Sequence, residues 1–180
     1  MKKVLIVVDM QNDFIDGALG FEAASKVIEP IKEKIAQARK EDTEIIFTFD
    51  THSKDYLHTE EGQWLPVPHV IEGTNGHELH PQIDALRLRT DVIFEKETFP
   101  SLALGQYLRK EAFDEVELCG LVSSMCVFSN AIIAKAALPN AKIVVDAKAT
   151  TTFDSNMHEM TLQMLDHLHI HVLKENDHAK

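Results

Sequence analysis

The sequence predicts an α/β protein built on a central six-stranded, mainly parallel β-sheet. Short segments rich in β-branched residues alternate along the chain with longer segments whose apolar residues recur at helical spacing. The first short segment, residues 4–8, is apolar throughout, as expected for a strand covered on both faces. The chain has 180 residues, a length that suits one domain, and we expect a single domain over residues 1–180.

The elements follow in chain order. After strand 4–8 we expect a helix over 23–39, because Val27, Ile31 and Ile35 share one face and charged residues lie between them. β-branched and aromatic residues then indicate strands over 44–49, 91–94 and 116–119. An apolar helix over 124–137 follows, with a serine suited to its N-cap. Strand 141–145, helix 155–168 and strand 169–173 complete the order, with right-handed crossovers between parallel strands.

The exception to this alternation is residues 51–89. The segment contains Pro66, Pro68 and Pro81 and shows little periodicity. A loop of this length inside a compact domain usually serves function, so we expect it to contribute to a binding site.

Composition and charge narrow the class of partner. Eighteen basic and 29 acidic residues give a net charge of −11, which repels phosphate backbones and anionic lipid and argues against nucleic-acid or membrane partners. Two cysteines cannot form a disulfide framework. No apolar run approaches the roughly 18 residues that a membrane span requires, and the five apolar residues at 4–8 are too few for a signal peptide. We therefore expect a cytoplasmic protein.

Reactive side chains follow four of the predicted strands. Asp9 and Asp50 end the first two, Lys96 ends the third, and Cys126 lies in the turn after the fourth. In an open parallel sheet, chemistry gathers beyond the carboxyl ends of the strands. The sequence therefore predicts that these side chains meet.

Cys126 is the candidate nucleophile of this group. It falls in the first turn of helix 124–137, where unpaired amides and a nearby Lys96 are expected to lower the pKa of its thiol. Asp9 could accept the thiol proton and return it to a leaving group. The alternative is that Cys126 is an ordinary buried cysteine, as we expect for Cys119 inside strand 116–119.

Three segments carry a resemblance to a known family. Val-Val-Asp-Met-Gln-Asn-Asp-Phe at 7–14, Phe-Glu-Lys at 94–96 and Gly-Leu-Val-Ser-Ser-Met-Cys-Val at 120–127 resemble the isochorismatase-like cysteine hydrolases. The resemblance runs through nearly the whole chain and implies a three-layer α/β/α sandwich. It also implies an Asp–Lys–Cys triad that opens a carboxamide or related bond, with Cys126 as nucleophile, Asp9 as general base and acid, and Lys96 as the cation that holds both.

The same resemblance implies an oxyanion hole and a cis peptide before the cysteine. The cis bond would fall at Leu121–Val122, and the N–H groups of Val122 and Cys126 would bind the oxyanion. Where the family usually has Thr-Asp or Thr-Glu, this chain has Ser123-Ser124, which bears on the substrate more than on the triad.

A second group of residues suits a metal ion. Asp50 and His52 stand two apart, and His69 follows in the long loop. Two imidazoles and a carboxylate suit Zn²⁺, Fe²⁺ or Mn²⁺, with positions left open for water or a ligand. The spacing alone leaves open that these residues form no metal site.

Among isochorismatase-like hydrolases, the chain resembles the nicotinamidases most. Its Asp-Thr-His at 50–52, Pro-Val-Pro-His at 66–69 and Gly-Thr-Asn-Gly at 73–76 are similar to theirs. The resemblance implies one divalent ion, with zinc expected and iron or manganese as alternatives, held by Asp50, His52 and His69. Glu60 aligns with an additional ligand in some members, although Glu61 is adjacent. Phe14, Trp64 and Phe99 would stack on the substrate ring, and Trp64 would form a pocket wall.

We therefore expect a cysteine-dependent amidohydrolase that converts nicotinamide and water to nicotinate and ammonia, accepts pyrazinamide, and serves NAD salvage. Its partner would be a small carboxamide, and a homo-oligomer is left open. Three alternatives remain. The chain could be a related amidase for a carbamoyl or ureido acid, a non-catalytic ligand-binding relative, or a metal-dependent hydrolase without covalent catalysis.

Overall fold

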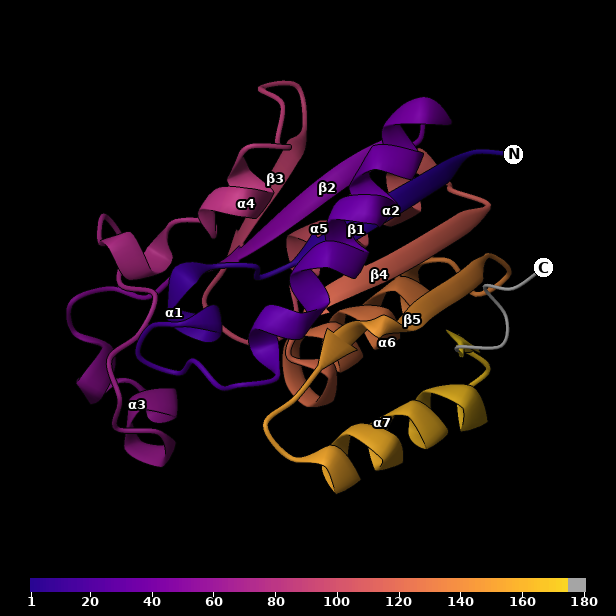
Figure 1. Cartoon of the computed structure of the whole chain (residues 1–180). Helices are drawn as coiled ribbons and strands as arrows, with labels where there is room; N and C mark the ends of the chain where they lie inside the picture. Colours follow the sequence, from indigo (N-terminus) through magenta and orange to yellow (C-terminus); the bar gives the residue numbers. More distant parts are fainter. Residues whose placement is uncertain (175–180) are drawn as a thin grey trace.

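The computed structural model describes residues 1–174. In that part of the chain, six strands form one parallel sheet in the order β3-β2-β1-β4-β5-β6 (Figure 1). The strands are β1 (Lys3–Val8), β2 (Glu44–Asp50), β3 (Val92–Lys96), β4 (Glu115–Leu121), β5 (Lys142–Thr151) and β6 (His171–Leu173). The predicted α/β class with a parallel six-stranded sheet is confirmed.

The longer helices of the described chain pack on both faces of the sheet: α2 (Ile28–Lys40) on one face, and α5 (Leu102–Glu111), α6 (Phe128–Ala137) and α7 (Ser155–His167) on the other. The short helices α1 (Asn12–Ile15), α3 (Glu60–Trp64) and α4 (Pro81–Asp84) lie in the connections between strands. Shorter turns are η1 (Ala24–Val27), η2 (Tyr56–His58), η3 (Asn75–His77) and the π-helical turn η4 (Ser123–Val127). No helix of residues 1–174 combines the length and apolar character needed to cross a membrane.

Two apolar cores lie between the sheet and the helices, one on each face of the sheet. Val4, Ile6 and Val8 of β1 point into one core with residues of α5, α6 and α7. Leu5 and Val7 point into the other with residues of α2. Because successive side chains of a strand point to opposite faces, one apolar strand supplies both cores, and helices cover the sheet on both sides (Figure 1).

The strand order creates a switch point at the centre of the sheet. From β1 the chain moves outward to β2 and β3, and it then returns to the other side of β1 with β4. Loops that leave β1 and β4 therefore diverge at the carboxyl end of the sheet, which is where ligands of open α/β proteins bind. Asp9 and Cys126 both lie on these loops.

The structure corrects the bounds of two predicted strands. β5 extends to Thr151 because the sheet continues past an irregularity between Leu118 and Gly120 of β4. β6 begins at His171 rather than 169, since His169 has a φ of +60° and cannot continue a strand.

The helix predicted over 23–39 divides into η1 and α2, and helix α5 has no counterpart in the prediction. α5 begins where the Ser101 hydroxyl accepts a hydrogen bond from the Leu104 N–H at 3.1 Å. The helix predicted over 124–137 begins in η4 instead, and no side chain caps that turn.

Candidate active site and metal centre

The structure brings Asp9, Lys96 and Cys126 together at the switch point. Lys96 ends β3, and its Nζ lies 2.7 Å from Asp9 Oδ2 and 3.6 Å from Cys126 Sγ. No more than 5% of any of the three residues is exposed. The expected meeting of these side chains is thus present, and the group is shielded from water.

Backbone geometry and Thr48 fix the Asp9 carboxylate. Asp9 has a φ of +46°, which turns the chain sharply as it leaves β1. The Thr48 hydroxyl donates to Asp9 Oδ1 at 2.6 Å, and the Asp9 N–H donates to the Thr48 carbonyl at 3.2 Å. Our sequence analysis missed Thr48; the available signal was a polar residue within the apolar strand β2.

Burial sets the protonation of the group. It raises the pKa of Asp9 against the opposing charge of Lys96, and Asp50 raises it further. Burial opposes the charge of Lys96, but Asp9, Cys126 and Asp50 outweigh it and raise the pKa of the ammonium. The group therefore holds a fixed cation beside a carboxylate that accepts a proton readily.

The expectation that the Cys126 thiol has a lowered pKa is wrong. Burial raises the pKa of the thiol well above its usual range; Lys96 opposes this, while Asp9 and Asp50 add to it. The sulfur thus rests as a thiol beside the Asp9 carboxyl group.

Asn130 anchors the turn that carries Cys126. This fully buried side chain donates to the Cys126 carbonyl at 2.8 Å and to the Phe99 carbonyl at 3.0 Å, and it accepts from the Ser101 N–H at 2.9 Å. It thereby ties the cysteine to the chain that follows Lys96. A lone amide in the apolar segment 128–137 was its sequence signal.

The Leu121–Val122 peptide is cis, at the position that the family resemblance implies. The Val122 carbonyl accepts hydrogen bonds from the N–H groups of Met125 and Val127, at 3.1 and 3.2 Å. These bonds fold the chain back on itself directly after the cis bond. Val122 and Cys126 are thereby brought into one tight turn.

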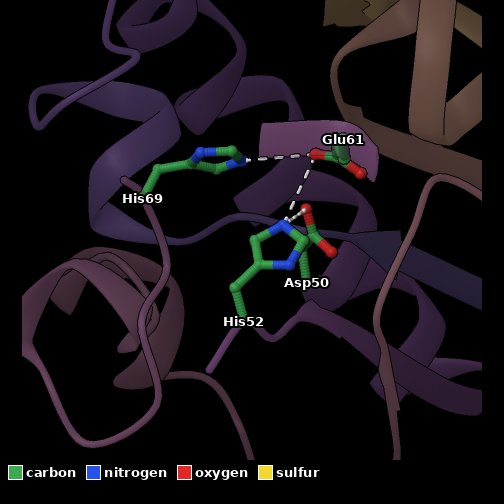
Figure 2. A group of neighbouring side chains, drawn as sticks. All are labelled: Asp50, His52, Glu61 and His69. Carbon is green, nitrogen blue, oxygen red and sulfur yellow. Dashed lines mark ion pairs between the residues drawn. The ribbon is translucent and has the colours of Figure 1, made fainter. Parts of the chain in front are cut away.

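A second cluster lies beside the first and has the composition of a metal centre. Figure 2 shows Asp50, His52, Glu61 and His69 pointing toward one another. One potential ligand atom from each lies within 4.8 Å of the others. Asp50 ends β2, His52 follows it, Glu61 lies in α3 and His69 in the loop after α3.

The structure places Glu61, not Glu60, in this cluster. Glu61 Oε1 lies 3.5 Å from His52 Nε2 and 3.8 Å from His69 Nε2. Glu60 instead accepts a hydrogen bond from the Trp64 indole at 2.7 Å. Neighbouring residues of a helix point about 100° apart, so only one of the two glutamates can face the histidines.

These four residues fit a divalent ion. Two ligands of a tetrahedral ion, each about 2.1 Å from it, stand about 3.4 Å apart, close to the 3.5 Å that separates His52 Nε2 from both Asp50 Oδ2 and Glu61 Oε1. His52 Nε2 is buried without a hydrogen-bond partner. Such an atom is costly unless a ligand or ion binds it.

The histidines are also oriented for ligation. His69 Nδ1 lies 2.8 Å from the Val67 carbonyl, a contact that leaves Nε2 for a metal. The buried ring of Tyr56 packs against His52 and His69, with ring centroids 4.6 and 4.9 Å apart. Tyr56 was missed in the sequence, where nothing set it apart from a core aromatic.

Replacing Glu61 by Gln should weaken zinc binding at least about tenfold, because the charge of one ligand is lost. The same change at Glu60 should leave the affinity within about twofold, since that side chain lies outside the cluster. Isothermal titration of the metal-free protein measures both. A larger effect at Glu60 than at Glu61 would contradict the assignment.

The affinity for metal should also depend on pH through His52. Burial opposes the imidazolium, but hydrogen bonds and charges from Asp50 and Glu61 outweigh it and raise the pKa of His52 from 6.5 to about 9. Since a ligand imidazole must be neutral, zinc affinity should rise from pH 7 to 9. The metal-free fold should become less stable over that range. A histidine whose pKa is raised in the folded protein stabilises the fold fully below its ordinary pKa of 6.5, and this stabilisation is lost as the pH rises through the pKa of about 9 in the folded protein. Calorimetry and thermal melts at pH 7, 8 and 9 test both; flat profiles would contradict the prediction.

Asp50 connects the two clusters. Its Oδ1 lies 3.5 Å from Lys96 Nζ, and its Oδ2 lies 3.5 Å from His52 Nε2. Gln11 fixes its backbone: the side chain donates to the Asp50 carbonyl and accepts from the Asp50 N–H, both at 2.8 Å. Asp50, the last residue of β2, is thus shared by the triad group and the metal group.

The residues expected to stack on a substrate ring are placed differently from one another. Phe14 lies edge-on to His69, with ring centroids 5.7 Å apart. Phe99 follows β3 by three residues and is 38% exposed. Trp64 is 82% exposed, so the structure does not support its role as a pocket wall. Residues four apart share a helix face, and Trp64 therefore accompanies Glu60 on the outer face of α3.

A pocket of about 340 Å³ opens beside the metal group. Its lining contains three glutamates and no lysine or arginine: Thr51, His52, Ser53, Thr59, Glu60, Glu61, Glu97 and Thr98. A larger cavity of about 580 Å³ lies farther along the loop, between Phe49 and Arg87. Only the first includes residues of the metal group.

Comparisons with known proteins identify the family and the fold. The isochorismatase domain family matches residues 3–177. A nicotinamidase/pyrazinamidase from Bacillus subtilis is 28% identical, with a TM-score of 0.87 over 97% of this chain and 100% of that one. A pyrazinamidase from Pyrococcus horikoshii, solved in complex with zinc, is 25% identical with a TM-score of 0.83, covering 97% and 99%.

A third solved structure has a different substrate in its name. The N-carbamoylsarcosine amidase from Thermoplasma acidophilum is 27% identical, with a TM-score of 0.79 over 97% of this chain and 96% of that one. All three similar proteins are named for hydrolysis of an amide bond, and they differ in the molecule that carries it.

Proposed function

The chain belongs to the isochorismatase family and is an amide-hydrolysing enzyme, and we propose that its substrate is nicotinamide, with pyrazinamide also accepted. The products would be ammonia and nicotinate, and the nicotinate would serve NAD salvage. The single observation that carries the proposal is the contact of Lys96 Nζ with both Asp9 and Cys126. The metal group adjoins this triad through Asp50, and its presence there supports the pyridine substrate.

In the proposed first half-reaction, the Cys126 sulfur attacks the carboxamide carbon while Asp9 takes the thiol proton. The N–H groups of Val122 and Cys126 stabilise the oxyanion of the tetrahedral intermediate. Asp9 then protonates the departing nitrogen, ammonia leaves, and the acyl group remains on sulfur as a thioester. Lys96 stays protonated throughout and holds the two partners in register.

In the second half-reaction, water attacks the thioester carbon, and Asp9 accepts a proton from that water. The intermediate collapses to the carboxylic acid and releases the Cys126 sulfur, which recovers its proton from Asp9. The sum is amide plus water to acid plus ammonia, and the enzyme returns to its starting state.

Asp50, His52, Glu61 and His69 would hold a divalent ion, with zinc as our first choice. Bound there, the ion would supply a Lewis-acid contact for the ring nitrogen or for a water molecule. Phe14, which lies edge-on to His69, and Phe99, which follows Thr98 of the pocket lining, would bound the ring by stacking.

The related amidase for carbamoyl acids is the second candidate, and the likeness to the N-carbamoylsarcosine amidase favours it. Such substrates carry a carboxylate. Besides the metal ligands, the pocket is lined by Glu60 and Glu97 and by no lysine or arginine, and this lining disfavours an anionic substrate. The pocket chemistry therefore supports the neutral carboxamide.

Ammonia release by the purified protein tests the proposal. Nicotinamide, pyrazinamide and N-carbamoylsarcosine are compared with zinc added and after chelation, alongside metal analysis. We expect turnover of the first two, its loss on chelation and its return with zinc. Turnover of N-carbamoylsarcosine alone, or none of nicotinamide with metal replete, would contradict the substrate assignment.

A further inference from the structure

The turn that carries Cys126 is anchored in a way that its local sequence does not provide. No side chain caps η4, although Ser123 and Ser124 both precede the cysteine. Ser123 is fully buried, so its hydroxyl requires a partner inside the protein. That partner comes from a helix about 35 residues farther along the chain.

Two hydroxyl contacts reach from η4 to the C-terminal third of the described chain. Ser123 Oγ lies 2.9 Å from His158 Nδ1, within α7. Ser124 Oγ lies 3.0 Å from Thr152 Oγ1, just after β5. Both contacts hold the segment between the cis peptide and the cysteine, where this chain carries its Ser-Ser pair.

The start of α7 is itself held in place. Asp154 caps the helix by accepting the Met157 N–H at 2.8 Å, and the His158 N–H donates to the Asp154 carbonyl at 2.9 Å. Burial lowers the pKa of His158, with the charge of Glu159 opposing the shift. A neutral imidazole on a fixed helix turn is therefore presented to Ser123.

We propose that Ser123 and His158 form a positioning pair: their hydrogen bond fixes η4 against α7 and so holds the Cys126 sulfur beside Lys96. The proposal rests on the role of Cys126 given above. Asn130 holds the same turn through its hydrogen bond to the Cys126 carbonyl. The turn is therefore fixed on one side by α7 and on the other by Asn130. Displacement of a reacting atom by about 1 Å can slow a reaction by about a hundredfold.

A double-mutant cycle on the purified, zinc-loaded enzyme tests the pair. The variants are S123A, H158A and S123A/H158A, with H158N as the conservative replacement because an Asn amide can reach the Nδ1 position. Exposed His167, at the end of the same helix, supplies the matched control H167A. The readouts are kcat and KM for nicotinamide and the rate of Cys126 alkylation by iodoacetamide, resolved from Cys119 by peptide mass spectrometry.

We expect H158A and S123A each to lower kcat and the alkylation rate about tenfold, with KM nearly unchanged. The double variant should be no slower than either single one, because the two side chains make one interaction. H158N should recover to within about threefold of the parent, and H167A should match the parent. Should H158A fail to fold, S123A removes the same bond and leaves the imidazole packed.

The proposal would be overturned if the effects of S123A and H158A on kcat were independent and additive in the double variant. It would also be overturned if H158A and H158N lost the same amount of activity, or if S123A and H158A both kept the parental rates. Turnover of nicotinamide by the parent protein separates this failure from that of the proposed function. If the zinc-loaded parent does not turn over nicotinamide, the function fails. If the parent turns it over and the variants match the parent in kcat and in alkylation rate, only the positioning pair fails.

Discussion

Replacing Cys126 by Ala should lower kcat for nicotinamide by at least about 10⁴-fold, because loss of a nucleophile leaves only the binding and oxyanion contributions. The fold should persist: the change removes one sulfur atom from a packed site, at a cost of about 1–2 kcal/mol. Ammonia release and thermal unfolding measure the two effects.

Cys119→Ala is the matched control for this variant. Cys119 is fully buried in β4 and points into the core on the α2 side, whereas Cys126 belongs to the core on the other face. We expect its activity to stay within about threefold of the parent, since it lies outside the reacting group. Substantial activity in Cys126→Ala would instead favour hydrolysis without a covalent intermediate, which is the metal-dependent alternative raised by the sequence.

Replacing Lys96 by Gln should both inactivate the enzyme and destabilise it by about 3–5 kcal/mol. The ammonium lies 2.7 Å from Asp9 and 3.5 Å from Asp50, and each of the three side chains is at most 3% exposed. Its removal leaves two carboxylates facing each other without a counter-charge. Urea unfolding gives the loss of stability, and ammonia release gives the loss of activity.

Two further variants separate these effects. In Asp9→Asn/Lys96→Gln one carboxylate is also neutralised, so stability should partly return while activity stays absent. Lys34 of α2 pairs with Glu117 of β4 and Asp146 of β5, at 2.6 and 2.5 Å, and contacts none of the triad residues. Lys34→Gln should therefore destabilise the fold and leave kcat nearly unchanged. Normal activity in Lys96→Gln would rule out the triad.

The parts of the site that the sequence predicted are those set by strand ends. Asp9, Asp50 and Lys96 follow short apolar strands, and parallel strands bring their carboxyl ends to one edge whatever their separation along the chain. The order of the strands across the sheet, β3-β2-β1-β4-β5-β6, was not predicted from the sequence and comes from the structure.

The residues that escaped prediction act through packing rather than through pattern. The choice between Glu60 and Glu61 depends on the rotation of α3, which no periodicity in a five-residue helix can define. Asn130 and Thr48 look like ordinary polar residues until their partners are known. The same holds for the Cys126 thiol: the helix start suggested a lowered pKa, but burial, a property of the whole fold, raises it.

The account depends on an acyl group carried by Cys126, and trapping it is the most direct measurement. The enzyme is mixed with excess nicotinamide, quenched in acid within milliseconds and digested, and the Cys126 peptide is weighed. We predict a thioester adduct of the nicotinoyl group on that peptide and none on the Cys119 peptide. Rapid turnover with the Cys126 peptide unmodified at every quench time, in an enzyme that stays active after Cys126→Ala, would contradict the account.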